Sequence, residues 1–409
     1  MTISSRNPLD LQGEVAVKIR RWIRTPLAVF LVIDFFYMFV FASTRSVISQ
    51  QATHLGASTV LIGLLVSTFA VLPLFFSIPI GKWIDRLQPK RMILFGATGS
   101  FISLLIPFLY PSIPTLFFSQ ALFGFSHNCI VISLQQGVGH SGKNRDKAIA
   151  AFSLATSFGD LTGPLYAGFV FEHLGFRWIF GSAAVIILFA IALTWLLPLR
   201  IIPQRAGTSE AGQKRGNTLS LLRNEGMRKA IVASGLVVYS KDLFVAYFPV
   251  YGLSIGLSSS QIGIILSLVS VASIIVRAIQ FQLVQRFTRE KVLIASLALA
   301  GWAYLLVPLL QQGWLIGLVA LILGAGLGVG QPLSTVLVLN LSPPGRSGES
   351  LGMRISFNRF CQLAAPTLFG LVGGSLGVIP IFWLSGVFLL SGSWYSRMKK
   401  GGTAKAFSS

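Results

Sequence analysis

The chain has 409 residues, of which 53% are hydrophobic and only 11% charged, and its mean hydropathy is +0.74. Soluble domains carry roughly 25% charged residues, so these values exclude an ordinary soluble fold, and they equally exclude a disordered chain. The two cysteines, Cys129 and Cys361, are too few for a disulfide scaffold.

Apolar runs long enough to cross a bilayer follow one another along the chain. A membrane-spanning helix needs about 20 mainly apolar residues. We therefore predict an all-α integral membrane fold with twelve transmembrane helices. They are 26–44, 59–80, 92–110, 114–136, 148–170, 178–197, 230–251, 260–281, 292–310, 314–339, 350–373 and 379–396.

The net charge of +21 comes from basic residues that alternate between connections. Twenty-seven of the 33 lysines and arginines lie in the terminal segments and in every second connection, and only Arg45 and Arg177 lie in the others. Cytoplasmic loops are enriched in Lys and Arg. We therefore predict a multi-pass protein of the plasma membrane (the bacterial inner or cytoplasmic membrane) with both termini in the cytoplasm, and no nucleic-acid partner.

One sizeable polar segment, 198–229, interrupts the apolar runs in the middle of the chain. Its prolines, glycines and seven basic residues are typical of a flexible linker. It divides the chain into an N-terminal six-helix bundle at 1–197, a cytoplasmic linker at 198–229 and a C-terminal six-helix bundle at 230–409.

The two halves share three short similarities in the same order. Their offsets are nearly constant, which favours a duplicated six-helix unit and two pseudo-symmetric bundles. Secondary transporters are often built this way, with the substrate site at the repeat interface. The matched segments are 34–36 with 242–244, 81–91 with 281–291, and 163–168 with 365–370.

Carboxylates inside predicted spans are the candidates for proton coupling, because buried charges are costly and mark ion pathways. Asp34 and Asp242 occupy equivalent places in the two halves, and Asp160 lies in the fifth span. We expect Asp34, with Asp242 as its partner, to exchange the proton. The alternatives are structural ion pairs, Asp242 with Arg359 or Asp34 with Lys241, and local satisfaction of Asp160 by its own helix.

Polar and aromatic side chains in other spans are candidates for substrate binding. Arg354 and Arg359 could hold an anionic group between them. The alternatives are that His127 is a hydrogen-bonded core residue, that Arg354 snorkels to the membrane edge, and that the aromatic residues face lipid. The candidates are Tyr37, Gln120, His127, Asn128, Lys241, Tyr247, Asn358, Arg359 and Gln362.

The connection between the second and third spans is a candidate conformational latch. Asp85 would lie at the positive N-terminal end of the eleventh span, near 348–351, and would bias the inward against the outward state. The alternative is that the basic residues only set the topology. The candidate latch residues are Gly81, Asp85, Arg86, Lys90 and Arg91.

With these motifs, the chain resembles the major facilitator superfamily over its whole length. Residues 81–91, GKWIDRLQPKR, follow that family's pattern Gly-x-x-x-Asp-Arg-x-Gly-Arg-Lys/Arg-Arg, except that Gln88 replaces a glycine and Pro89 a basic residue. Gln120 stands where the family's exporters often have an arginine, four residues before a glycine. A third segment resembles the Gly-Pro motif of the antiporter branches, in which a bent helix faces the other half. Its residues are Gly159, Gly163, Pro164 and Gly168.

The resemblance implies a secondary active transporter that works by alternating access, most simply proton-coupled efflux (antiport) of a drug-like amphiphile or metabolite. We find no catalytic, nucleotide-binding or metal-ligand motif, so we expect no enzyme activity and no cofactor or metal. The expected partners are a small-molecule substrate, protons and membrane lipids, and the expected state is a monomer. The alternatives are a proton symporter or anion exchanger for uptake of an organic anion and, from another class, a non-transporting receptor or membrane enzyme.

Overall fold

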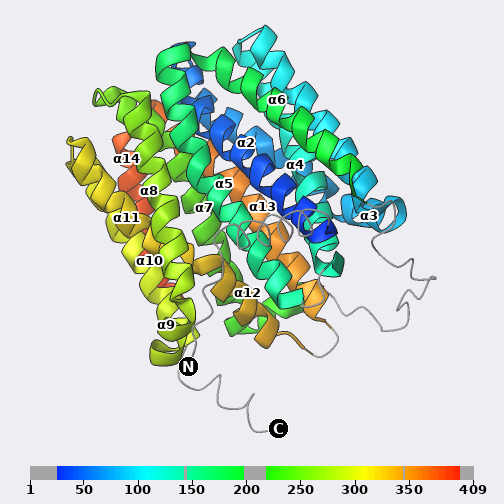
Figure 1. Ribbon diagram of the computed structural model, residues 1–409. Helices are drawn as coiled ribbons and strands as arrows, with labels where there is room; N and C mark the ends of the chain where they lie inside the picture. Colours follow the sequence, from blue (N-terminus) through cyan, green and yellow to red (C-terminus); the bar gives the residue numbers. More distant parts are fainter. Residues whose placement is uncertain (1–24, 142–144, 198–217, 344–345, 397–409) are drawn as a thin grey trace, which may run out of the picture.

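The computed structural model describes residues 25–141, 145–197, 218–343 and 346–396, which form a bundle of long helices without a β-strand (Figure 1). The helices are α2 (Pro26–His54), α3 (Thr59–Leu109), α4 (Ile113–Ser141), α5 (Arg145–Leu174), α6 (Phe176–Trp195), α7 (Glu225–Ser254), α8 (Ser259–Ala278), α9 (Gln280–Phe287), α10 (Arg289–Leu306), α11 (Gly313–Gly328), α12 (Gly330–Asn340), α13 (Ser347–Leu376) and α14 (Ile379–Tyr395), with short 3₁₀ helices at Thr218–Arg223 and Val307–Leu309.

Nine helical segments within the described chain are long and apolar enough to cross a membrane. Helix α3 supplies two of them, Thr59–Ser77 and Arg86–Leu109, and it kinks at Gln88, near the start of the second segment. Three further helices are not among the nine. Helix α14 is apolar but has only 17 residues, whereas α5 and α13 have 30 residues each but a lower mean hydropathy than the nine segments. Together with the nine, these three helices account for the twelve predicted spans.

Helix boundaries differ from the sequence predictions at several places, for example at the end of α2, at the kink of α3 and at the start of α7. Arg45, predicted in a connection, lies inside α2, because one charged residue ended the apolar run but not the helix. Helix α7 begins at Glu225, earlier than the predicted boundary at 230. Residues 198–217 of the predicted linker lie outside the described residues.

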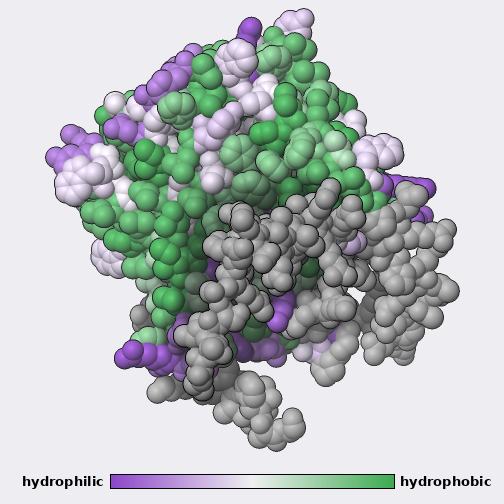
Figure 2. Space-filling view, viewed as in Figure 1, coloured by the Kyte–Doolittle hydropathy of each residue, from purple (hydrophilic) through white to green (hydrophobic). Residues whose placement is uncertain are grey.

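The lateral surface of the bundle is apolar. In Figure 2 hydrophobic residues cover most of the middle of the visible face, and hydrophilic residues gather toward the two ends. Large apolar side chains point outward, including Phe75 at 69%, Phe169 at 58% and Trp302 at 58% exposure. So much exposed apolar surface is favourable only against lipid.

The connections between helices lie at two opposite ends of the bundle. We call the end at which α2, α5, α7 and α13 begin the basic end. We call the other end, at which these four helices finish, the far end. The far end carries the short connections 55–58, 110–112, 255–258, 310–312 and 377–378.

We call α2–α6 the N-terminal half and α7–α14 the C-terminal half. The two halves pack together most closely toward the far end, through α3 with α13 and α5 with α8. Each interface contains two facing glycines. A Cβ built on Gly168 of α5 would lie 3.1 Å from the Cα of Gly263, and one built on Gly370 of α13 would lie 3.3 Å from the Cα of Gly63. Small residues let helix backbones approach this closely in membranes.

Two residues share an unusual backbone conformation. Gln88 has φ 70° and ψ 152°, and Thr288, between α9 and α10, has φ 69° and ψ 151°. This region of φ and ψ is essentially restricted to glycine, the residue that the family pattern has at position 88. The turn therefore retains the glycine geometry in both halves without the glycine.

Candidate functional site

A cavity of about 280 Å³ lies between the two halves, where α2, α5, α7 and α8 face one another. Its wall combines apolar side chains, such as Phe41, Phe244 and Leu266, with several polar groups. A largely apolar pocket with a few placed polar groups is the usual form of a small-molecule site. The polar lining residues are Arg45, Ser46, His127, Ser157, Asp160, Lys241, Asp242, Ser270, Ser273, Arg277, Gln331 and Gln362.

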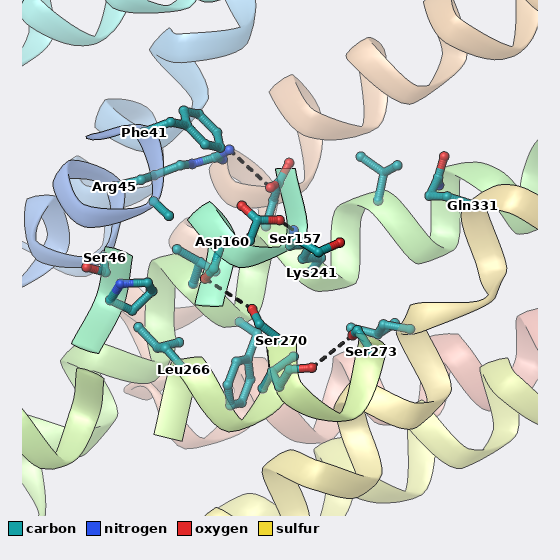
Figure 3. A pocket seen from close by; sticks show the side chains of 18 of the residues that line it. Phe41, Arg45, Ser46, Ser157, Asp160, Lys241, Leu266, Ser270, Ser273 and Gln331 are labelled. Atoms are coloured by element: carbon teal, nitrogen blue, oxygen red, sulfur yellow. Dashed lines mark hydrogen bonds and ion pairs between the residues drawn. The ribbon is translucent and has the colours of Figure 1, made fainter. Parts of the chain in front are cut away.

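Two ion pairs cross the cavity from one half to the other (Figure 3). Arg45 Nη1 on α2 lies 3.2 Å from Asp242 Oδ1 on α7, and Lys241 Nζ on α7 lies 2.8 Å from Asp160 Oδ2 on α5. The pairs considered from the sequence, Asp242 with Arg359 and Asp34 with Lys241, were wrong. Asp160 is paired with the other half and not satisfied within its own helix.

A hydrogen-bonded chain extends the first ion pair. Gln362 Nε2 on α13 donates to Asp242 Oδ2 at 2.7 Å, and its Oε1 accepts from Arg359 Nη1 at 2.8 Å. Arg359 Nη2 in turn donates to Asn128 Oδ1 on α4 at 3.0 Å. Arg45 and Arg359 therefore both connect the two halves close to Asp242.

Asp34 lies apart from this network. It is fully buried and does not line the cavity, although it lies on the same helix as Arg45. Thr156 Oγ1 on α5 donates to Asp34 Oδ2 at 2.7 Å, so the contact lies within the N-terminal half. Among the described residues, nothing hydrogen-bonds Asp34 Oδ1.

His127 on α4 is both a core residue and a lining residue. Its ring stacks on Phe41 with the centroids 4.4 Å apart and on Tyr37 at 5.7 Å. Tyr37 and Tyr247 are fully buried behind the wall, where Tyr247 Oη donates to the carbonyl of Pro366 at 2.6 Å. Gln120 is also buried and does not line the cavity.

A second polar cluster joins α7, α12 and α13. Arg354 Nη2 donates to Gln331 Oε1 at 2.6 Å, and Gln331 Nε2 donates to the carbonyl of Ser234 at 2.9 Å. Ser234 Oγ donates to Asn358 Oδ1 at 2.9 Å. Arg354 is buried in this cluster, so it does not snorkel to the membrane edge.

The sequence analysis missed several lining residues. Arg45 was assigned to a connection, and Arg277, near the end of the predicted span 260–281, was given no role. Ser157 and Ser270 belong to no motif that would single them out. The signal that could have found the arginines is their cost: a cation in a membrane helix needs a partner or a role.

A sequence model of the Major Facilitator Superfamily matches residues 30–366 and, in a second match, residues 230–407. The chain belongs to the major facilitator superfamily. The family and the fold are those of membrane transporters, which are not enzymes.

The superfamily relatives include multidrug resistance proteins. Multidrug resistance protein 2 of Bacillus subtilis is 24% identical over 331 residues, covering 79% of this chain and 82% of the relative. Multidrug resistance protein MdtG of Enterobacter lignolyticus is 26% identical over 353 residues, covering 82% and 83%.

Solved structures of the superfamily fold align with nearly the whole chain. The nucleoside transporter NupG gives a TM-score of 0.74 at 13% identity, covering 91% of this chain and 98% of the other. A bacterial homologue of the human lysosomal transporter Spinster gives 0.75 at 12% identity, covering 90% and 95%. At this identity the likeness concerns the fold alone.

The structure describes most, but not all, of the side chains in the superfamily's loop motif at 81–91. The ammonium of Lys90 donates to the carbonyls of Trp195 at 2.9 Å and Leu197 at 2.7 Å, so it caps the end of α6. Arg86 and Arg91 are exposed, and Gly81 faces open space. The side chain of Asp85 lies outside the described residues, so its predicted place in the latch stays a prediction.

The Gly-Pro motif of this superfamily member packs α5 on two neighbours. A Cβ on Gly159 would lie 2.7 Å from Met38 Cβ of α2, whereas Gly168 faces α8 across the halves. Helix α5 continues through Pro164, which lines the cavity. The motif therefore lets α5 lie close to both α2 and α8.

Proposed function

We propose that this chain is a proton-coupled exporter that carries an amphiphilic organic solute through the cavity by alternating access. The wall combines a mainly apolar surface with charged and polar groups, which suits such a solute, and the names of the multidrug resistance relatives support export. We further propose that the basic end faces the cytoplasm, as the distribution of Lys and Arg favours.

The observation that carries the proposal is the ion pair between Arg45 and Asp242. It joins the two halves inside the cavity, and both side chains are nearly buried, at 12% and 9% exposure. Protonation of Asp242 removes the negative charge that attracts Arg45, and an uncompensated buried cation is costly. Proton binding would therefore loosen the contact between the halves.

Coupling follows if solute and proton act on the same contact. A solute in the cavity lies beside the ion pair, so solute and proton each change the energy of one arrangement of the halves relative to the other. A ligand shifts a conformational equilibrium only through such differential interaction. Exchange then proceeds because each occupant favours a different state of the same cross-half contact.

The experiment measures uphill uptake in inside-out membrane vesicles with an acidic lumen and the membrane potential clamped. The probes are naphthylmethyl and octyl compounds with either a sulfonate or a trimethylammonium group, whose fixed charges prevent passive accumulation by pH. We expect uptake of at least one probe by the native protein. In Asp242→Asn, uptake should fall to the level of empty vesicles while exchange of probe for probe persists.

The matched control is Glu290→Gln, which neutralises a carboxylate in the first turn of α10, outside the cavity. It should leave uptake unchanged. Full uphill uptake in Asp242→Asn would refute the coupling role of Asp242, and uptake of no probe by the native protein would refute the proposed export.

A further inference from the structure

The charges on the cavity wall do not balance. Of the described lining residues, Arg45, Lys241 and Arg277 carry positive charge, and Asp160 and Asp242 carry negative charge. Both carboxylates are engaged by the protein itself: Asp160 with Lys241 and Asp242 with Arg45. The charge left over is that of Arg277.

Arg277 lies in the last turn of α8 and keeps part of its guanidinium free. Its Nε donates to the carbonyl of Gly328 at 2.8 Å, and its Nη1 donates to Ser157 Oγ at 3.3 Å. A guanidinium has five N–H donors, so three remain uncommitted in this arrangement. In the described ranges, no carboxylate lies within 4.0 Å of the Arg277 guanidinium.

The residues around the cavity strengthen the imbalance. Arg359, behind Gln362, is held by two amide oxygens, and Arg354 is held by the side chain and carbonyl of Gln331. Neither arginine has a carboxylate partner in the part of the chain that the structure describes.

Arg354 is buried and Arg277 and Arg359 are half-buried, and none of the three has an ion pair of its own with a described residue. Asp160 attracts Arg277 only at longer range. Asp242 likewise attracts Arg359 only at longer range. Cations inside a membrane protein are costly, so a role that needs positive charge would explain them.

We propose that the exported solute is an amphiphilic anion, whose sulfonate, carboxylate or phosphate group binds the free donors of Arg277. Two cations contact the same face of α5 one helical turn apart, since Lys241 contacts Asp160 and Arg277 contacts Ser157. Apolar lining such as Leu266 and Ile274 on α8 accommodates the rest of the molecule. A cationic solute finds no uncommitted carboxylate among the described lining residues. This inference rests on the proposed function and names its substrate class.

Arg277 also has a structural role that the test must separate from binding. Its bond to Gly328 satisfies a carbonyl at the end of α11, where the helix dipole favours a cation. If that were its whole role, a change at position 277 would weaken the protein and affect every solute equally. Recognition of an anion instead predicts a loss confined to anionic solutes.

The test measures binding by calorimetry to the full chain in lipid nanodiscs. The probes are the naphthylmethyl and octyl sulfonates, the matching carboxamides and the matching trimethylammonium compounds. We expect the sulfonates to bind more tightly than the other two classes. In Arg277→Gln the Kd of the sulfonates should rise roughly tenfold or more, as expected for lost charge-assisted hydrogen bonds, and the Kd of the carboxamides should stay within about twofold.

Two further variants keep the result interpretable. Arg177→Gln removes a positive charge from an exposed position in the first turn of α6 and should change no affinity. Arg277→Lys retains the charge and should retain part of the preference for sulfonates, even if Arg277→Gln fails to fold.

The outcomes separate this inference from the proposed function. The proposal that the solute is an anion would be refuted if the trimethylammonium or carboxamide probes bound more tightly than the sulfonates, or if Arg277→Gln weakened the binding of all classes equally. The proposal of export would remain. A native protein without preference for sulfonates would overturn it without any variant. Absence of binding by every probe would count against both proposals, and the vesicle assay would then show whether export itself fails.

Discussion

Asp34 and Asp242 have the same side chain at equivalent places in the two halves, but their surroundings differ. Asp242 faces the cavity and contacts both an arginine of the other half and Gln362. Asp34 is sealed between α2 and α5, and its hydrogen-bond partner Thr156 belongs to its own half. A proton on Asp34 therefore acts on packing within one half, whereas a proton on Asp242 acts on the contact between halves.

We predict that Asp34→Asn folds and inserts normally and reduces uphill uptake less than Asp242→Asn does. The amide oxygen can still accept the hydrogen bond from Thr156, and the cavity wall is unchanged. The vesicle assay, normalised to the amount of inserted protein, measures the difference. Collapse of uptake in Asp34→Asn together with full uptake in Asp242→Asn would return the coupling role to α2, as the sequence alone favoured.

At the scale of the elements, the turns at Gln88 and Thr288 have the clearest energetic consequence. Both residues adopt a conformation that side chains with a Cβ occupy at a cost of about 1–3 kcal/mol. They stand at matching places in the two halves, before the helical segments that begin near Pro89 and at Arg289. The strain is therefore a property of the repeated unit and not of one loop.

We predict that Gln88→Gly and Thr288→Gly each stabilise the protein, by about 1 kcal/mol, because glycine adopts this conformation freely and loses only part of the gain to chain entropy. Thermal unfolding in detergent measures the effect as a higher Tm. Leu87→Gly is the control, since its helical conformation makes glycine unfavourable by about 1 kcal/mol and the Tm should fall. A lower Tm for Gln88→Gly would show that its side-chain contacts outweigh the strain.

At the scale of the whole molecule, the two halves meet through glycines near the far end. The contacts between Gly168 and Gly263 and between Gly63 and Gly370 leave no room for a Cβ without a shift of one helix. Alternating access requires these contacts to open when the cavity is exposed at the far end. Their closeness therefore sets part of the balance between the two states.

We predict that Gly168→Ala shifts the protein toward a state with the far end apart, because the new Cβ meets the backbone carbonyl of Ser259. Electron–electron distance measurements between spin labels at the exposed positions Leu55 and Ser375 should show a larger population of long distances. Gly352→Ala, whose Cβ meets nothing within 4 Å, should leave the distribution unchanged. The same distribution in Gly168→Ala as in the native protein would contradict this role.

The order of the helices was predictable because apolar runs of membrane length depend only on local composition. The pairing of the charged residues in the cavity was harder to predict. The partner of Asp242 is on another helix and in the other half, and which residues face each other depends on how each helix is rotated about its axis. Because hydropathy falls at Arg45, the predicted first span stops at residue 44, although α2 continues to His54. A residue that is placed outside the helix in the prediction cannot be recognised as part of a cavity wall.

The site was partly predictable for a similar reason. Asn128, Arg359 and Gln362 were expected to bind substrate, and the structure places them in one hydrogen-bonded chain that ends on Asp242. Their polarity inside apolar helices was the signal. Arg277 carried the same signal, a charged side chain inside the predicted span 260–281, but the sequence analysis assigned it no role.

The two hydrogen bonds from Lys90 to the end of α6 have a mechanical consequence. They tie the turn at 81–91 to the carbonyls of Trp195 and Leu197, directly before the segment that connects the halves. The turn and the basic end of α6 are therefore held together outside the cavity. A displacement of the turn carries the end of α6 with it, and the charged groups in the cavity take no part in this connection.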